Sequence, residues 1–257
     1  MPKLTLLGTG AALSDAKREN MYFVVKGKAG AILVDCAGSP VQRLLTARVR
    51  LDSIDHVILT HHHPDHLYGL PIFLMDLWLG GRKRILHLYG LPETIRATRA
   101  LLDAFDWHEW HDHGFFPTEF HTLEIPQNGI GSVLDTPDFK ITATRTTHFV
   151  PTIALKFVSN ATGKSLTYSS DTEVAKSVEE IARGSHTLIH EATSITETTP
   201  GHSSAREAGQ QATRAGVKQL VLVHLPPNGS VANLRAAAVK TFKGKVIVAK
   251  DFQTIQF

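Results

Sequence analysis

Six consecutive residues, His61-His62-His63-Pro64-Asp65-His66, carry the most distinctive chemistry of this sequence. They form the pattern His-x-His-x-Asp-His, and neutral imidazoles and carboxylates are good ligands for zinc-like cations. The apolar run Val57-Ile58-Leu59-Thr60 precedes them and predicts a buried strand. A loop that leaves a strand can bring such side chains together where a regular element cannot. The spacing predicts two ions, with His61 and His63 directed to one, and Asp65 and His66 to the other.

Four further candidate residues each follow a predicted strand directly. Any one of them alone would more often be a capping or surface residue than a ligand. Because all four come in order after the first cluster, we interpret them as parts of the same site. They are His148, Asp171, Glu191 and His224.

Predicted strands and helices alternate along the chain and must position these residues. The strands are short apolar runs rich in β-branched residues, and the helices show helical patterns. Strands are predicted over 3–7, 22–25, 31–35, 56–60, 84–88, 140–147, 153–158, 165–169, 187–190, 219–223 and 245–248. Helices are predicted over 40–48, 67–79, 92–104, 174–183, 203–215 and 231–241. Ser204 and Glu207 predict a capping box, and Gly216 is expected to end the same helix.

Length and composition favour an ordinary globular protein. The chain has 257 residues, of which 42% are hydrophobic and 20% charged. A formal net charge of +3 permits an anionic substrate without demanding nucleic acid. No apolar run reaches the roughly 18 residues of a membrane helix, and the N-terminus lacks a signal-peptide pattern. We therefore expect a cytoplasmic protein without membrane contact, and the single cysteine, Cys36, fits a reducing compartment.

The chain contains no linker rich in Pro, Gly or Ser, so we expect one domain over residues 1–257. Each half starts with antiparallel-looking strands and ends with alternating strands and helices. This weak symmetry predicts two sheets packed face to face, with helices outside and the site at one edge between the halves.

Residues 105–116 are rich in aromatic and histidine side chains and allow two interpretations. The segment is either a lid over the metal site or a partly buried connection with surface histidines. We assign none of the histidines in this region to metal: His108, His111, His113 and His121.

Taken together, these motifs resemble the metallo-β-lactamase superfamily, and within it the ribonuclease Z branch. The resemblance implies an α+β fold, a four-layer αββα sandwich of two mixed sheets with outer helices. His-Glu-Ala-Thr at 190–193 and the segment at 201–208 are more specific to the tRNA-processing branch than the other motifs. The remaining matches are the strand ending in Asp-x-x-Gly at 33–38, the His-x-His-x-Asp-His motif at 61–66, the aspartate segment at 168–172 and Val-His-Leu at 223–225.

The resemblance also implies a centre with two divalent metal ions, zinc or manganese, which share a hydroxide. Its residues imply catalytic roles for Asp65, Glu191 and His202, with His202 and Glu191 protonating the leaving oxygen. The alternative role of His202 is to cap the helix that starts at Ser203. The implied ligands are His61, His63 and His148 for one ion, Asp65, His66 and His224 for the other, and Asp171 as the bridge.

Ribonucleases Z that mature tRNA carry an arm between the third-motif histidine and the bridging aspartate. Here that interval, residues 149–170, already holds two predicted strands and a turn, so it has no room for an arm. We expect a phosphodiesterase that acts on RNA 3′ ends or on small or cyclic nucleotides. The alternatives are a hydrolase of carboxylic, lactone or sulfate esters, and a non-catalytic metal-binding protein. Related proteins commonly dimerise, so a homodimer through residues 105–116 is compatible with the resemblance.

Overall fold

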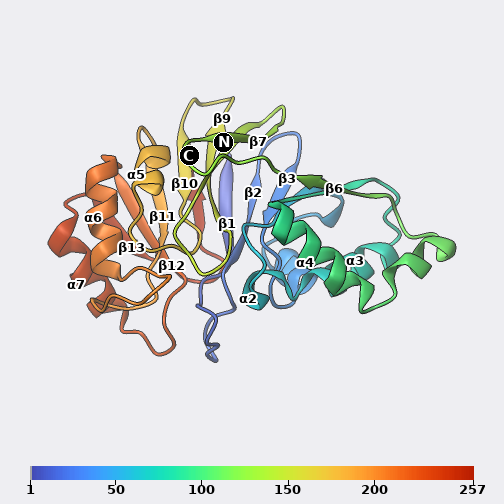
Figure 1. Cartoon of the computed structure of the whole chain (residues 1–257), viewed down its shortest axis with the longest axis horizontal. Coiled ribbons are helices and arrows are strands. Elements are labelled where there is room, and N and C mark those ends of the chain that lie inside the picture. Colours follow the sequence, from blue (N-terminus) through green and yellow to red (C-terminus); the bar gives the residue numbers. More distant parts are fainter. Residues whose placement is uncertain (1) are drawn as a thin grey trace.

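Two seven-stranded sheets pack face to face in the computed structural model, which describes residues 2–257 (Figure 1). The first sheet has the order β14 (Thr254–Gln256), β1 (Lys3–Gly8), β2 (Tyr22–Lys26), β3 (Ala31–Val34), β4 (Ile54–Ile58), β5 (Leu86–Gly90) and β6 (Thr118–Thr122). The second has the order β13 (Lys245–Val248), β12 (Gln219–Val223), β11 (Thr187–Glu191), β10 (Ser165–Tyr168), β9 (Ile153–Ser159), β8 (Phe139–Arg145) and β7 (Gly131–Asp135).

Helices cover both outer faces of the pair of sheets, so the predicted four-layer αββα sandwich is confirmed (Figure 1). On the first sheet lie α1 (Pro40–Thr46), α3 (Leu70–Leu79) and α4 (Pro92–Asp103), and on the second lie α5 (Lys176–Ala182), α6 (Ala205–Ala215) and α7 (Val231–Thr241). The remaining helices are the one-turn α2 (Pro64–Leu67) and the 3-10 helices η1 (Leu51–Ser53) and η2 (Trp107–His113). Within the part of the chain described, no helix has the length and apolar character that crossing a membrane requires.

Each sheet joins an antiparallel part to a parallel part. In the first sheet β1, β2 and β3 are antiparallel, and β3 to β6 are parallel. In the second, β7 to β10 are antiparallel, and β10 to β13 are parallel. The two halves of the chain therefore repeat one arrangement, as their sequence patterns predict. The carboxyl ends of the parallel strands leave loops at one edge, where open sheets of this kind bind ligands.

The core between the sheets is built from side chains that alternate along the strands. Phe23 of β2 meets Tyr168 of β10 edge to face, with ring centroids 5.0 Å apart. Both rings are almost completely buried, and full burial of one large apolar side chain contributes about 1.5–3 kcal/mol. This contact joins the two sheets next to the edge that carries the candidate ligands.

A break between α2 and α3 replaces the single helix predicted over 67–79. Gly69 donates its backbone N–H to the Cys36 carbonyl, 2.9 Å away. A Cβ atom at Gly69 would lie 2.8 Å from the Ala37 backbone, so only glycine permits this approach. The break therefore lets α2 pack against the turn after β3. This packing places His66 beside Asp35.

The structure favours the second interpretation of residues 105–116, a partly buried connection. Trp110 stacks on Trp78 of α3 with centroids 5.6 Å apart. Trp107 packs edge to face on Phe120 of β6 at 5.6 Å. Figure 1 places the segment at the outer end of the helical layer of the first sheet. The aromatic residues thus extend the core under the helices.

Candidate metal centre

The candidate ligands come together where β4, β8, β10 and β12 end. His61 and His63 lie on the loop after β4, and Asp65 and His66 lie on the first turn of α2, directly after Pro64. Pro is well suited to the start of a helix because the N–H that it lacks would have no partner there. The second half of the chain supplies the remaining candidates, which follow β8, β10 and β12: His148, Asp171 and His224.

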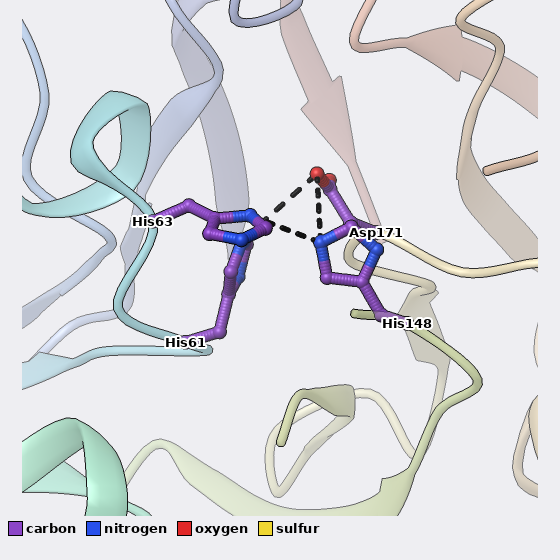
Figure 2. A group of neighbouring side chains, drawn as sticks. All are labelled: His61, His63, His148 and Asp171. Carbon is purple, nitrogen blue, oxygen red and sulfur yellow. Dashed lines mark hydrogen bonds and ion pairs between the residues drawn. The ribbon is translucent and has the colours of Figure 1, made fainter. Parts of the chain in front are cut away.

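One group of donors consists of His61, His63, His148 and Asp171 (Figure 2). Figure 2 shows the two histidines of the first half facing His148 and Asp171 of the second half. His63 Nδ1 lies 3.0 Å from His148 Nε2. Asp171 Oδ2 lies 3.9 Å from both His61 Nε2 and His148 Nε2. The group matches the ligands predicted for the first ion together with the predicted bridge.

A second group consists of Asp65, His66 and His224. Asp65 Oδ2 lies 3.4 Å from both His66 Nε2 and His224 Nε2. Asp171 Oδ2 lies 3.6 Å from His66 Nε2 and 3.3 Å from His224 Nε2. The Asp171 carboxylate thus stands between the two groups, the position that a bridging ligand needs.

Four of the five histidines use one ring nitrogen to contact the protein and turn the other toward the site. A hydrogen bond of this kind fixes the tautomer and the ring orientation of a metal ligand. The contacts to Nδ1 come from Thr60 for His61 (3.1 Å), Asp35 for His66 (2.9 Å), the Gly201 carbonyl for His148 (2.6 Å) and Thr193 for His224 (3.1 Å).

Two buried carboxylates, Asp35 and Glu191, organise these contacts in parallel ways. Asp35 accepts a hydrogen bond from His66 directly, and Thr60 donates to Asp35 while it contacts His61. In the second half, Glu191 contacts His202 directly, and Thr193 donates to Glu191 while it contacts His224. Each half of the fold therefore holds one histidine directly and another through a threonine hydroxyl.

The donor atoms fit a metal because several of them lack any other partner. His61 Nε2, His66 Nε2 and Asp171 Oδ1 are buried without a hydrogen bond among the residues that the structure describes. An unpaired buried polar group costs about 1–3 kcal/mol. Coordination to a cation removes this cost, and nitrogen and oxygen donors without thiolate suit zinc or manganese.

Strained backbone positions occur at three turns around the site. Asp35, Ser170 and His224 have positive φ angles of 58°, 52° and 50°. Residues other than glycine held in this region cost on the order of 1–3 kcal/mol each, and such strain clusters at functional sites. The three turns follow the ends of β3, β10 and β12. They therefore lie at the edge of the sheets that carries the candidate ligands.

The histidines also set the charge state of Asp171. Burial alone would raise the pKa of this carboxyl, but His224 and His66 outweigh burial and hold it well below its usual range. Asp171 is therefore a carboxylate at neutral pH, the form that binds cations.

His202 lies beside the two groups, and its Nδ1 is 3.1 Å from Glu191 Oε1. Burial alone would lower the pKa of His202, but the hydrogen bond and charge of Glu191 raise it above its ordinary value. Glu191 is fully buried and also accepts the Thr172 backbone N–H at 2.6 Å. Ser204 rather than His202 caps α6, because its hydroxyl accepts the Glu207 N–H in a capping box. The capping box is confirmed, and His202 does not serve as the N-cap.

Sequence patterns indicate the donors but miss the residues that orient them. Thr60 ends a predicted strand, and Thr193 and Gly201 lie within the two branch motifs, but no pattern predicts that they contact His61, His224 and His148. Asp35 does carry a sequence signal, since it ends a predicted strand in the Asp-x-x-Gly pattern.

Comparison with known proteins agrees with this architecture. A family model described as the beta-lactamase superfamily domain matches residues 31–225. Ribonuclease Z of Mycobacterium bovis is 29% identical over 279 residues, covering 100% of this chain and 98% of the relative. Ribonuclease Z of Mycolicibacterium gilvum is 28% identical and covers 100% of this chain and 96% of the relative.

Solved structures show the same fold. The metallo-beta-lactamase fold protein YhfI from Bacillus subtilis matches with a TM-score of 0.81 at 24% identity, covering 99% of this chain and 98% of that one. The short form of human tRNase Z matches with a TM-score of 0.77 at 24% identity and the same coverage. The predicted resemblance and the expected hydrolase class are confirmed by the family match and these full-length relatives. The chain belongs to the beta-lactamase superfamily domain family.

Proposed function

We propose that this chain is a phosphodiesterase of the ribonuclease Z type that works with two divalent metal ions. The observation that carries the proposal is the His202–Glu191 pair next to two donor groups that have Asp171 between them. Cleavage of a phosphodiester releases an alkoxide or ribose oxygen of high pKa. A general acid that protonates this leaving oxygen therefore accelerates the reaction. A site for more activated esters would not need such a pair.

The residues divide the work as follows. His61, His63 and His148 would hold one ion, Asp65, His66 and His224 the other, and Asp171 would bridge them. When bound, the two ions supply Lewis acidity and lower the pKa of a coordinated water. His202 presents its second ring nitrogen, Nε2, to the leaving oxygen because Glu191 occupies Nδ1. Glu191 keeps the imidazole protonated and oriented until the proton moves.

An exposed aromatic ring beside the site supports a nucleotide or RNA substrate. Phe149 follows His148 directly and is 66% exposed. Its ring centroid lies 6.2 Å from that of His202. Gly201 permits this position, because a Cβ atom there would lie 2.5 Å from the Phe149 ring. A base stacked on an aromatic side chain gains about 1–3 kcal/mol.

The interval between His148 and Asp171 excludes an arm for gripping tRNA within it. It holds β9 and β10, which are joined by a tight turn at residues 160–164. The substrates to test are accordingly RNA 3′ ends and small or cyclic nucleotides. The expected homodimer and the cytoplasmic location stay predictions, the first of which light scattering would check.

The deciding experiment measures hydrolysis of bis(4-nitrophenyl) phosphate by zinc- or manganese-loaded protein, beside Asp171→Ala and the control His186→Gln. His186 is exposed and belongs to neither donor group. We expect metal-dependent turnover in the wild type and the control, and loss of both bound metal and turnover in Asp171→Ala. A folded, doubly metallated protein that leaves phosphodiesters intact would overturn the proposal. Turnover of carboxylic, lactone or sulfate esters would then identify the alternative activity.

A further inference from the structure

Three metal-competent side chains outside the candidate metal centre converge at the far end of the first sheet. His87 lies on β5, and Glu119 and His121 lie on the edge strand β6. The parallel register pairs His87 with Glu119 and Tyr89 with His121. Side chains alternate between the two faces of a strand. All four therefore share the face on which Tyr89 joins the core between the sheets.

The donor atoms already have the spacing of a coordination shell. His87 Nδ1 lies 3.0 Å from His121 Nε2 and 3.2 Å from Glu119 Oε2. Glu119 Oε2 lies 3.6 Å from His121 Nε2. Ligands at about 2.0–2.2 Å from a tetrahedral zinc ion are about 3.3–3.6 Å apart. Only small shifts would bring the three atoms onto one ion, and water could take the fourth position.

Neighbouring rings hold the two imidazoles in place. Tyr89 stacks on His121 with centroids 4.5 Å apart and an angle of 13° between the rings. His56 of β4 stacks on His87 at 5.3 Å and 20°. The Tyr89 hydroxyl lies 3.3 Å from His56 Nδ1 and so links the two stacks. Side chains ordered before binding lose less entropy when a ligand arrives, which favours affinity.

The charges of the cluster also suit a cation. His87 Nδ1, His121 Nε2 and Glu119 Oε2 are nitrogen and oxygen donors of the kind that bind zinc-like cations. Glu119 adds a carboxylate whose side chain is 55% exposed, which leaves an approach from solvent.

We propose that His87, Glu119 and His121 form a binding site for a zinc-like divalent cation, separate from the candidate metal centre. Two imidazoles and one carboxylate with an open fourth position are a donor set that zinc proteins use. The site shares no donor with the residues of the candidate metal centre. The ion would tie β6, an edge strand with one hydrogen-bonded neighbour, to β5 through side chains.

The test counts zinc ions bound per chain, by elemental analysis after chelator treatment and equilibrium dialysis of the full-length protein against Zn²⁺. We expect His121→Gln to bind one ion fewer than the wild type, and the control His186→Gln to bind as many. The visible absorption of bound Co²⁺ should decrease in His121→Gln and stay unchanged in His186→Gln. We expect Asp171→Ala to lose ions from the candidate metal centre and to keep this one, which distinguishes the two sites.

Glu119→Gln provides a second variant, because a side chain 55% exposed can be replaced without disturbing the core. It should lose the same single ion as His121→Gln. Circular dichroism and metal-dependent hydrolysis should stay unchanged in both variants, which shows that the loss is not due to unfolding. Zinc counts equal to that of the wild type in folded His121→Gln and Glu119→Gln would overturn the proposal.

Discussion

His66 Nδ1 lies 2.9 Å from Asp35 Oδ2, and both side chains are completely buried. Asp35 also accepts the Thr60 backbone N–H at 2.8 Å and its hydroxyl at 3.0 Å, so the carboxylate itself is fixed. Burial raises the pKa of Asp35, while His66 and Thr60 oppose that rise. The pair turns His66 Nε2 toward Asp65 and Asp171 before any ion arrives.

Asp35→Asn should weaken metal binding about 10- to 100-fold, because partners that orient a metal ligand contribute to affinity on this scale. Asparagine keeps the shape but loses the charge that favours the Nδ1–H tautomer of His66. Competition with a chromogenic chelator measures the affinity. Asp52→Asn, at an exposed aspartate, is the control and should match the wild type. Equal affinities in both variants would remove the orienting role of Asp35.

His202→Ala should slow hydrolysis of diesters with poor leaving groups by about 10²–10⁴-fold, the usual contribution of a general acid. Nitrophenolate leaves without a proton, so the same variant should lose little rate on the chromogenic diester. Metal content should stay at the wild-type value. Steady-state rates on a dinucleotide and on the chromogenic diester provide the comparison. Equal losses on the two substrates would contradict proton donation by His202.

Glu191→Gln should combine two defects, since Glu191 contacts His202 directly and His224 through Thr193. We expect the leaving-group dependence of His202→Ala together with a loss of metal affinity that His202→Ala lacks. Rates on the two diesters and chelator competition measure the two effects separately. Wild-type metal affinity in this variant would argue against the path through Thr193.

Phe149→Ala should reduce kcat/KM on nucleotide substrates about 10-fold or more, in line with about 1–3 kcal/mol for a stacked base. A phosphodiester without a base or ring should be cleaved at the wild-type rate, because the chemistry does not involve the ring. Phe105→Ala is a matched control, since Phe105 is 53% exposed and lies in the aromatic segment far along the helical layer. Equal effects of the two substitutions would contradict a stacking role.

Much of this fold follows from local sequence pattern. The strands with buried apolar runs, such as β12, and the helix α6 with its capping box and closing Gly216 coincide with their predicted ranges within a few residues. The strands β6, β7 and β14 are absent from the prediction, and all three lie at sheet edges. Edge strands bury little and alternate weakly. The sequence Thr-Glu-Phe-His-Thr of β6, for example, has one apolar residue.

The site residues also fall into those that local sequence pattern predicts and those that only the fold brings together. The His-x-His-x-Asp-His motif gathers its donors within one loop and one helical turn, so spacing alone indicates them. His87 and His121 are 34 residues apart and meet only through the register of β5 with β6. Because β6 itself is not predicted, no sequence pattern brings these two histidines together. The orienting contacts through Thr60 and Thr193 likewise depend on packing between distant segments.

The strand β14 returns from the end of the chain to pair with β1 at its start. β1 is synthesised long before β14, because residues 3–8 precede residues 254–256. Until β14 has been made, β1 has an open edge on which other strands can add. The first donor group includes His148 and Asp171, and the second includes His224. A nascent chain therefore cannot assemble either group from its first half alone, because each group draws donors from both halves.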